Sequence, residues 1–337
     1  MNTPSRRTTL MKNLFSIGAV MLDGAGVAAF GQEPAATIGH ANSGTYLAAS
    51  VPDFSGIWAH PSFPGFEPPA SGPGPVVNKS RRPQIVDVDG RTLPAANGVL
   101  VSNFHQLVGD YTNPILKSQA AEVVKKHGEL SLRGLGYPTP TTQCWPEPVP
   151  YILNSVAMQM FQQSDKITFL YPNDHQVRYV LMNQPHPAQV KSSWYGDSVG
   201  RYEGDTLVID TVGVKIGPFA MIDWYGTPYT QALHVVESYR LLDYDSAKEG
   251  LERDAKENMH LLGADAGSAP DHNYRGKHLQ LQFTVEDEGV FTVPWSATIT
   301  YRRGAEAWRE VVCAENTRGL ATAGKDAAVP TANRPDF

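Results

Sequence analysis

The second half of the chain alternates short runs of β-forming residues with clusters of turn-forming residues. Clusters such as Pro172-Asn173-Asp174 and Arg303-Gly304-Ala305 are short enough to join neighbouring runs as hairpins. Short strands joined by tight turns favour an antiparallel sheet that closes into a barrel or folds into a sandwich. The pattern predicts a mainly β protein, with strands near 156–161, 166–171, 176–183, 198–202, 206–213, 233–242, 278–286, 290–293, 296–302 and 308–314.

Before residue 150 the pattern is less regular. Residues 60–100 are rich in Pro and Gly and predict long wrapping loops, with a hairpin around Gln84 to Leu93. Apolar residues at helical spacing predict a helix over 114–127, with Pro114 in its first turn and Gly128 ending it. A second, charged stretch at 244–276 predicts a short helix followed by a long excursion.

One short motif favours the barrel over the sandwich. Gly56-Ile57-Trp58, at the start of the first expected strand, resembles the Gly-x-Trp signature of lipocalin-like (calycin) barrels. In that family the Gly lets two chain segments approach closely and the Trp closes one end of the barrel. We therefore expect an antiparallel lipocalin-like β-barrel with one or two peripheral helices, forming one domain over 51–316 and followed by a tail at 317–337.

The first residues are typical of a cleavable export signal. A basic start with Arg6, Arg7 and Lys12 precedes an apolar run from Leu14 to Phe30, which predicts a signal over 1–33. The paired arginines resemble a twin-arginine signal, so we expect a periplasmic or secreted protein. The apolar run is interrupted by Asp23 and falls short of the roughly 20 residues that a membrane span needs. The alternative is a leader without function.

The cysteines and the net charge indicate a disulfide and the kinds of partner to expect. The chain holds two cysteines, Cys144 and Cys313, and in an oxidising compartment they are expected to form a disulfide. The formal net charge is -6, and the chain has no basic patch with interleaved aromatic residues, so nucleic acid is not expected as a partner. The sequence does not indicate an oligomeric state.

Five blocks of sequence, taken together, resemble a widespread exported bacterial family of unknown function. The resemblance covers most of residues 51–316 and implies a barrel but no particular reaction. Relatives of this kind carry a His-Ser pair where this chain has Tyr229-Thr230, so no role that rests on that His carries over. The five blocks are Asp53–Trp58, Gln184–Pro187, Gly200–Gly213, Ala232–Glu237 and Cys313–Asn316.

Asp210 is the first candidate for chemistry, because it interrupts a strand that is otherwise apolar on both faces. Val208 and Val212 share its face, so we expect it to point into an apolar layer. Its functional interpretation is a general acid or base in a dry cavity. Its structural interpretation is a buried carboxylate satisfied by backbone N–H groups, by Arg178 or by Arg201.

Glu237 is a similar candidate. It lies in the middle of an apolar row with Leu233, Val235, Tyr239 and Leu241, whereas His234 lies on the opposite face. A barrel interior with one carboxylate is the layout of a site for a small apolar molecule with one proton-transfer group. The alternative interpretation is a cross-strand salt bridge.

Two loops carry further candidates. Prolines flank His186 in Gln184-Pro185-His186-Pro187, where a rigid loop could present the imidazole at the mouth of a barrel. The aromatic loop Met221–Tyr229 carries Asp223, Trp224, Tyr225 and Tyr229, and such a loop could act as a lid or line a pocket. The alternatives are a surface His and an ordinary surface loop.

Common cofactor and nucleophile motifs are absent from the sequence. No dinucleotide-binding or phosphate-binding Gly-rich loop occurs, and no metal motif such as His-Glu-x-x-His, so we expect neither a nucleotide nor a metal cofactor. Ser198 fits the spelling of a nucleophile elbow, but the segment after it is expected to be a strand, where that motif requires a helix.

We therefore expect an exported acid–base enzyme, of lyase or isomerase type, that acts on a small hydrophobic or aromatic compound in a barrel cavity. The alternatives are a carrier of an apolar molecule without catalysis and a packed structural module. The expected catalytic residues are Glu237, Asp210, His186, Asp223 and Tyr229. The expected substrate-binding residues are Trp224, Tyr225, Tyr239, His234 and Arg178.

Overall fold

The fold is taken from a computed structural model of the chain. It describes residues 51–61, 64–66, 68, 72–80, 84–86, 92–94, 107–135, 137–256, 273–304 and 312–313. All of these belong to one compact unit, residues 45–337. The expected export signal at 1–33 and the expected tail at 317–337 lie outside the described residues.

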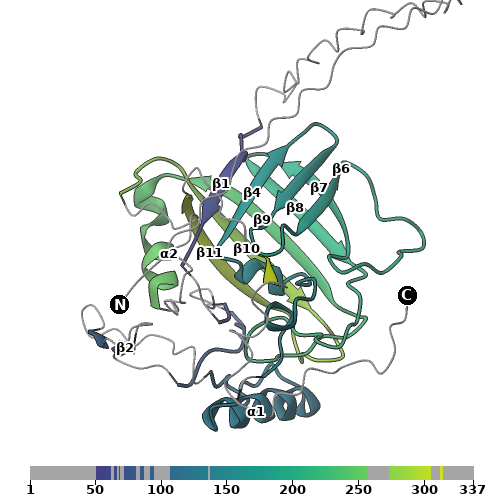
Figure 1. Ribbon diagram of the computed structural model, residues 1–337. Coiled ribbons are helices and arrows are strands. Elements are labelled where there is room, and N and C mark those ends of the chain that lie inside the picture. The colour runs from purple at the N-terminus through teal and green to yellow at the C-terminus, as the bar shows by residue number, and fades with distance from the viewer. Residues whose placement is uncertain are drawn as a thin grey trace, which may run out of the picture. The chain divides into compact units, whose positions relative to one another are not determined.

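Nine strands form a closed barrel, which confirms the mainly β prediction (Figure 1). Around the ring the order is β1-β11-β10-β9-β8-β7-β6-β5-β4, and β4 pairs with β1 to close it. This arrangement is compatible with the calycin-like barrel expected from the sequence. The strands are β1 (Gly56–Ala59), β4 (Ala157–Gln162), β5 (Lys166–Leu170), β6 (Val177–Met182), β7 (Asp197–Glu203), β8 (Thr206–Val212), β9 (His234–Leu242), β10 (His278–Glu286) and β11 (Trp295–Arg303).

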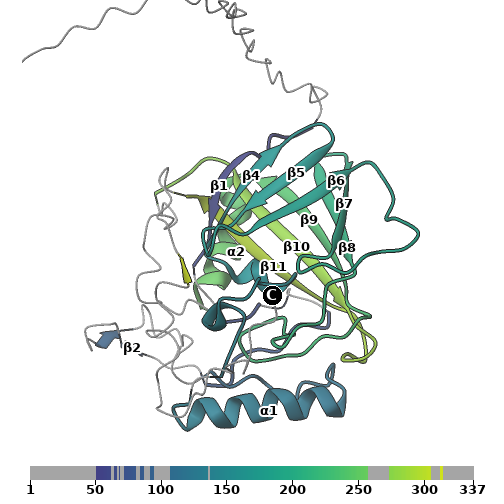
Figure 2. The same cartoon turned by 45° about the vertical axis from the view of Figure 1, so that its right-hand side comes forward.

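One pair of neighbouring strands is parallel and the other eight are antiparallel. The parallel pair is β6 and β7, with Leu181 opposite Val199. Strand direction cannot alternate throughout a ring with an odd number of strands, so at least one parallel pair is required. The link at 183–196 makes this reversal possible; it runs out from the barrel wall before returning to the start of β7 (Figure 2). This link carries His186.

The barrel interior is packed with large side chains. Alternate residues along each strand point inward, and those on β5, β9, β10 and β11 are almost all aromatic or aliphatic. The largest of them are fully buried: Trp58, Phe169, Tyr239, Phe283, Trp295 and Tyr301. A filled interior of this kind is typical of small barrels, whose core holds side chains in place of a ligand.

In the Gly-x-Trp segment of β1, Gly56 has a positive φ and Trp58 is fully buried. Gly56 has a φ of 124°, and a Cβ at this position would collide with the guanidinium of Arg303. That guanidinium lies 4.0 Å from the centroid of the Trp58 ring, and the Trp58 indole N–H donates to the carbonyl of Phe54 at 2.8 Å. The positive φ favours glycine at this position.

Helix α1 (Ser118–Leu132) is displaced from the expected range of 114–127. Residues 113–116 instead form a turn, in which Asn113 Oδ1 accepts from the Ile115 N–H at 3.1 Å, and Leu116 pairs with Phe291. Gly128 does not end the helix, because it lies inside it and lets α1 approach Val108. The helix therefore packs on the turn between β10 and β11, beyond one end of the barrel (Figures 1 and 2).

The remaining elements agree with the pattern in part. The expected hairpin is present as β2 (Gln84–Val86) and β3 (Thr92–Pro94). Helix α2 (Tyr244–Lys256) covers the outer face of β11, where Asp254 Oδ2 accepts from the Thr300 N–H at 2.6 Å. The expected strand at 290–293 is wrong, because these residues form the β10–β11 turn. The expected strand at 308–314 lies outside the described residues except for Val312 and Cys313, which are not in a strand.

The disulfide between Cys144 and Cys313 is confirmed, with the two Cα atoms 5.4 Å apart. It joins positions 169 residues apart, and a bond of this kind is typical of an oxidising compartment outside the cytoplasm. No helix within the described ranges is both long and apolar enough to cross a bilayer.

Candidate functional site

Glu237 lies inside the barrel and forms a buried ion pair. Its carboxylate accepts two hydrogen bonds from Arg178 of β6, one from Nη1 at 3.0 Å and one from Nη2 at 2.6 Å. The Tyr239 hydroxyl donates a third at 2.8 Å. Both charged side chains are fully buried. The salt-bridge interpretation of Glu237 is therefore the one that the structure shows.

The same ion pair spans four strands of the barrel wall. Arg178 on β6 and Glu237 on β9 are separated by β7 and β8, whose inward residues Ser198 and Thr211 fill the gap. Arg178 Nη2 donates to Thr211 Oγ1 at 2.8 Å and to Ser198 Oγ at 3.1 Å. A buried charge satisfied by this many partners fixes strand positions, because any shift would leave it unpaired. Arg178, Glu237 and Tyr239 therefore lie in a polar core among fully buried side chains.

Asp210 lies on the other face of the same wall. It is paired with Val236 in the ladder between β8 and β9, whereas Glu237 is paired with Ile209. Because successive residues of a strand point to opposite faces, Asp210 points outward where Glu237 points inward. The expectation that Asp210 enters a dry apolar layer is therefore wrong: its side chain is 30% exposed. The apolar neighbours Val208 and Val212 share its outer face.

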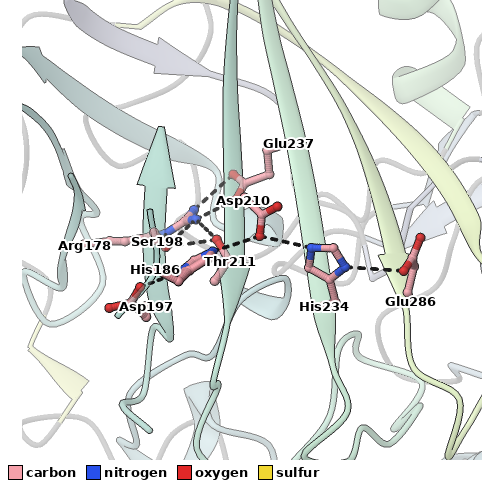
Figure 3. A network of polar contacts seen from close by, with 9 residues as sticks. All are labelled: Arg178, His186, Asp197, Ser198, Asp210, Thr211, His234, Glu237 and Glu286. Carbon is pink, nitrogen blue, oxygen red and sulfur yellow. Dashed lines mark hydrogen bonds and ion pairs between the residues drawn. The ribbon is translucent and has the colours of Figure 1, made fainter. Parts of the chain in front are cut away.

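A chain of alternating carboxylates and imidazoles crosses this outer face (Figure 3). Asp210 is at its centre: its Oδ1 lies 3.0 Å from His186 Nε2 and 3.0 Å from His234 Nε2. His186 Nδ1 lies 2.5 Å from Asp197 Oδ1, and His234 Nδ1 lies 3.3 Å from Glu286 Oε2. We call these five residues the outer-face cluster. It brings together Asp210, His186 and His234, three residues that the sequence singled out separately.

Strand register accounts for most of the outer-face cluster. His234 is the first residue of β9 and pairs directly with Glu286, the last residue of β10. Asp210 is opposite Val236, two residues from His234, so it is the diagonal neighbour of His234 on the same face. Asp197 begins β7, and His186 comes from the proline-flanked part of the 183–196 link. All four strand residues lie toward the end of the barrel where α1 packs.

The proton count of the outer-face cluster is unusual. Each of its four imidazole nitrogens faces a carboxylate oxygen. A neutral imidazole carries one N–H, so two neutral imidazoles supply protons for only two of the four contacts. At His186, partial burial acts to lower the pKa, but hydrogen bonds to Asp197 and Asp210 outweigh it and the pKa is raised. The geometry therefore favours a doubly protonated His186.

The aromatic loop at 221–229 is organised by Asp223. The Asp223 carboxylate accepts from the backbone N–H groups of Tyr225 and Thr227, both at 3.0 Å, while burial raises its pKa to about 6. Trp224 stacks on Tyr151 with ring centroids 6.4 Å apart. Tyr225 is buried, and the Tyr229 hydroxyl donates to the Lys215 carbonyl at 2.8 Å. Asp223 thus caps the loop internally and is not among the residues of the outer-face cluster.

A shallow cleft adjoins this loop, and of the expected site residues it includes Tyr229. Its volume is about 190 Å³, part of which is open to solvent. Trp145 meets Trp194 edge to face with centroids 5.2 Å apart and meets Phe219 at 6.1 Å. We call it the Trp–Pro cleft. It is lined by Pro140, Trp145, Pro146, Pro148, Trp194, Gly217, Pro218, Phe219 and Tyr229.

Glu147 is a buried acid that the sequence analysis missed. It lies between Pro146 and Pro148 of the Trp–Pro cleft, and its Oε1 accepts from Thr141 Oγ1 at 2.7 Å. Its backbone N–H donates to Gln176 Oε1 at 2.7 Å. Burial raises the pKa of Glu147 to about 7. The signal in the sequence was a lone carboxylate in Trp145-Pro-Glu-Pro148, where neighbouring prolines remove backbone donors that could satisfy it.

Comparison of the chain with protein-family models, with curated proteins and with solved structures gives no match. The resemblance to an exported bacterial family therefore stays an expectation from the five sequence blocks. Within the part of the chain that the structure describes, no group of His, Cys, Asp and Glu side chains is arranged to hold a metal ion.

Proposed function

We propose that the protein is an exported acid–base catalyst, of lyase or isomerase type, whose reacting groups lie in the outer-face cluster and not in the barrel interior. The observation that carries the proposal is the double contact of Asp210 Oδ1 with the two imidazole Nε2 atoms at 3.0 Å. In the part of the interior that the structure describes, Glu237 is already held by Arg178 and Tyr239.

His234 is the proposed catalytic residue. A doubly protonated His186 and a neutral His234 together carry three N–H protons. These protons are enough for the three shorter of the four imidazole–carboxylate contacts, so the longest contact has no proton. That contact is His234 Nδ1 to Glu286 Oε2, the longest at 3.3 Å, and Glu286 is the most exposed member at 51%. A neutral His234 would then donate its Nε2–H to Asp210 and keep a lone pair on Nδ1. This nitrogen becomes available when the Glu286 side chain turns into solvent.

The chemistry that follows is a proton transfer by one imidazole. His234 Nδ1 takes a proton from a carbon atom of the substrate, and the C–H electron pair forms a new double bond. In an elimination the leaving group departs with its bonding pair and takes the proton back from the imidazolium. In an isomerisation the proton returns to a different carbon atom. Both outcomes leave the enzyme in its starting state and need no external oxidant or reductant.

Asp210 and His186 are proposed as positioning residues. Asp210 holds the ring orientation and tautomer of His234, as a carboxylate behind a catalytic imidazole does in many hydrolases. His186, charged by its contacts with Asp197 and Asp210, holds the Asp210 carboxylate in position. The disulfide and the expected export signal agree with action outside the cytoplasm, in the periplasm or in the medium.

The test is a search for compounds that the protein consumes. The purified protein is incubated with a mixed small-molecule extract, and mass spectrometry follows which compounds disappear and which isomers or elimination products form. We expect His234→Asn to abolish the conversion and Asp210→Asn to reduce it by a factor of about 100 or more. The matched control is His175→Asn, which changes an exposed His in a turn outside the cluster. Equal conversion by His234→Asn and wild type would overturn the proposal.

A carrier that transforms nothing is the second candidate, and the Trp–Pro cleft is the observation that favours it. The cleft offers aromatic surface without a charged group among its lining side chains. A carrier would retain its ligand unchanged during the same incubation, and neutralising Asp210 would leave the affinity for that ligand unaltered.

A further inference from the structure

The Trp–Pro cleft has walls suited to a flat ring. Prolines have no backbone N–H, so the four that line the cleft present C–H groups and leave no donor unpaired when water is displaced. Trp145 is 38% exposed, so a ligand can reach its indole ring from solvent. Its edge-to-face contacts with Trp194 and Phe219 leave the cleft aromatic on several sides.

The backbone at Trp145 is held in place by the preceding residue and by a hydrogen bond. The preceding residue, Cys144, has a φ of 54° and is held by the disulfide to Cys313. The Trp145 N–H donates to the Pro140 carbonyl at 3.0 Å. A backbone held by a neighbouring cross-link and a hydrogen bond loses little further freedom when a ligand binds, which favours binding.

A cation, Lys215, lies beside this aromatic surface. Lys215 Nζ lies 4.6 Å from the centroid of the Trp194 ring, and the Lys215 carbonyl accepts from the Tyr229 hydroxyl. Among the described residues no carboxylate lies within ion-pair distance of Lys215. Lys215 is not part of the lining of the cleft, but its ammonium group lies next to the aromatic wall at Trp194, and this combination is complementary to an aromatic ring that carries a negative charge.

The cleft and the outer-face cluster lie close together along the chain. Trp194 of the cleft precedes Asp197 of the cluster by three residues, which limits the distance between their Cα atoms to about 10 Å. Lys215 follows β8, the strand that carries Asp210. A ring held against Trp194 would thus be near the backbone of Asp197, at one end of the outer-face cluster.

We propose that the Trp–Pro cleft binds a small aromatic carboxylate, with the ring against Trp145 and Trp194 and the carboxylate on Lys215. As a description of the substrate this inference rests on the proposed function, whereas the binding itself does not. The enclosed part of the cleft has room for about one water molecule, so the ring would lie across its mouth, against the exposed side of Trp145.

The test is titration of the full chain with benzoate, followed by calorimetry and by quenching of tryptophan fluorescence. Two further probes separate the features of the ligand: benzyl alcohol has the ring without the charge, and cyclohexanecarboxylate has the charge without the aromatic ring. We expect benzoate to bind at least about tenfold more tightly than either. Trp145→Ala should weaken benzoate binding by about tenfold or more, and Lys215→Met by about fivefold, as expected for an exposed ion pair. The control Lys126→Met, on α1 and outside the cleft, should bind as wild type does.

Each outcome decides the inference. Absence of benzoate binding to the wild-type chain at millimolar concentration overturns it, as does binding that Trp145→Ala and Lys215→Met leave unchanged. Equal affinity for cyclohexanecarboxylate overturns the aromatic part, and equal affinity for benzyl alcohol overturns the part played by Lys215. His234→Asn separates this inference from the proposed function, because the variant should bind benzoate normally while it converts no substrate.

Discussion

Asp210 and Glu237 lie on neighbouring strands, one residue out of register, and therefore on opposite faces of the barrel wall. The two carboxylates cannot act on one molecule in one cavity. Glu237 belongs to the polar core with Arg178, and Asp210 belongs to the outer-face cluster with His186 and His234. We therefore assign a role in stability to Glu237 and a role in catalysis to Asp210, and the two roles can be tested separately.

Glu237→Gln should destabilise the barrel strongly. The change leaves the guanidinium of Arg178 buried without its counter-charge, which in comparable buried pairs raises the free energy of the folded state by about 3–5 kcal/mol. Urea unfolding followed by tryptophan fluorescence measures the change. The control Asp205→Asn removes the exposed partner of Arg240 and should leave the free energy of unfolding nearly unchanged. Equal stability of Glu237→Gln and wild type would contradict the structural role.

Glu147 should make the protein less stable as the pH rises from about 4.5 to about 7. Burial favours its neutral form, so the folded state keeps a proton that the unfolded chain has already lost in this window. The contribution of Glu147 to the free energy of unfolding is fully present below its unfolded pKa of 4.5. It falls as the pH rises to about 7 and is constant above that pH. Its size is of the order of 3 kcal/mol.

Glu147→Gln isolates this effect, because the amide oxygen can still accept from Thr141 but does not titrate. The difference in unfolding free energy between wild type and Glu147→Gln, measured at several pH values, should change across the window and be flat on both sides. A difference that does not vary with pH would show that Glu147 does not titrate abnormally.

His186 should also make the protein less stable as the pH rises, but in a higher pH range than Glu147. Its raised pKa means that the protonated form is favoured by folding, so its contribution is fully present below the ordinary value of 6.5 and is lost as the pH rises through the higher folded value. Histidine ring signals in NMR report this pKa directly. Asp197→Asn and Asp210→Asn should each lower it toward 6.5, because each removes one of the two carboxylates in contact. An unaltered His186 titration in both variants would contradict the contacts described.

Breaking the disulfide should affect both stability and the Trp–Pro cleft. The bond closes a loop of 169 residues, and the loss of that cross-link is expected to lower the unfolding free energy by about 4–5 kcal/mol. The double variant Cys144→Ser with Cys313→Ser should also bind benzoate more weakly, since Trp145 is no longer held. Urea unfolding and the benzoate titration measure the two effects. Two free thiols in the denatured, unreduced wild-type protein would contradict the cross-link.

The sequence predicted the fold better than the site. Alternation and turns located the principal strands, and Gly56-Ile57-Trp58 favoured a barrel, because both signals are local. Alternation shows which residues share a face but not which face is inward, so Asp210 could not be placed. In that strand both faces are apolar, which left no contrast to decide between them.

The contacts of the site depend on register and on a long link, neither of which a local pattern contains. His234 meets Asp210 through the diagonal of the β8–β9 ladder, and His186 reaches them from the 183–196 link. Glu147 went unnoticed because its importance comes from burial by residues distant in the sequence, such as Gln176. Helix α1 was misplaced for a related reason, since Leu116 pairs with Phe291 and does not enter the helix.

The most direct test of the central claim is the pH dependence of kcat/KM for a compound that the protein consumes. We predict that His234→Asn lowers kcat/KM at every pH and that Asp210→Asn lowers it to a smaller extent, while His175→Asn reproduces the wild-type profile. A His234→Asn profile that coincides with that of the wild type in height and position would contradict the assignment of acid–base chemistry to the outer-face cluster.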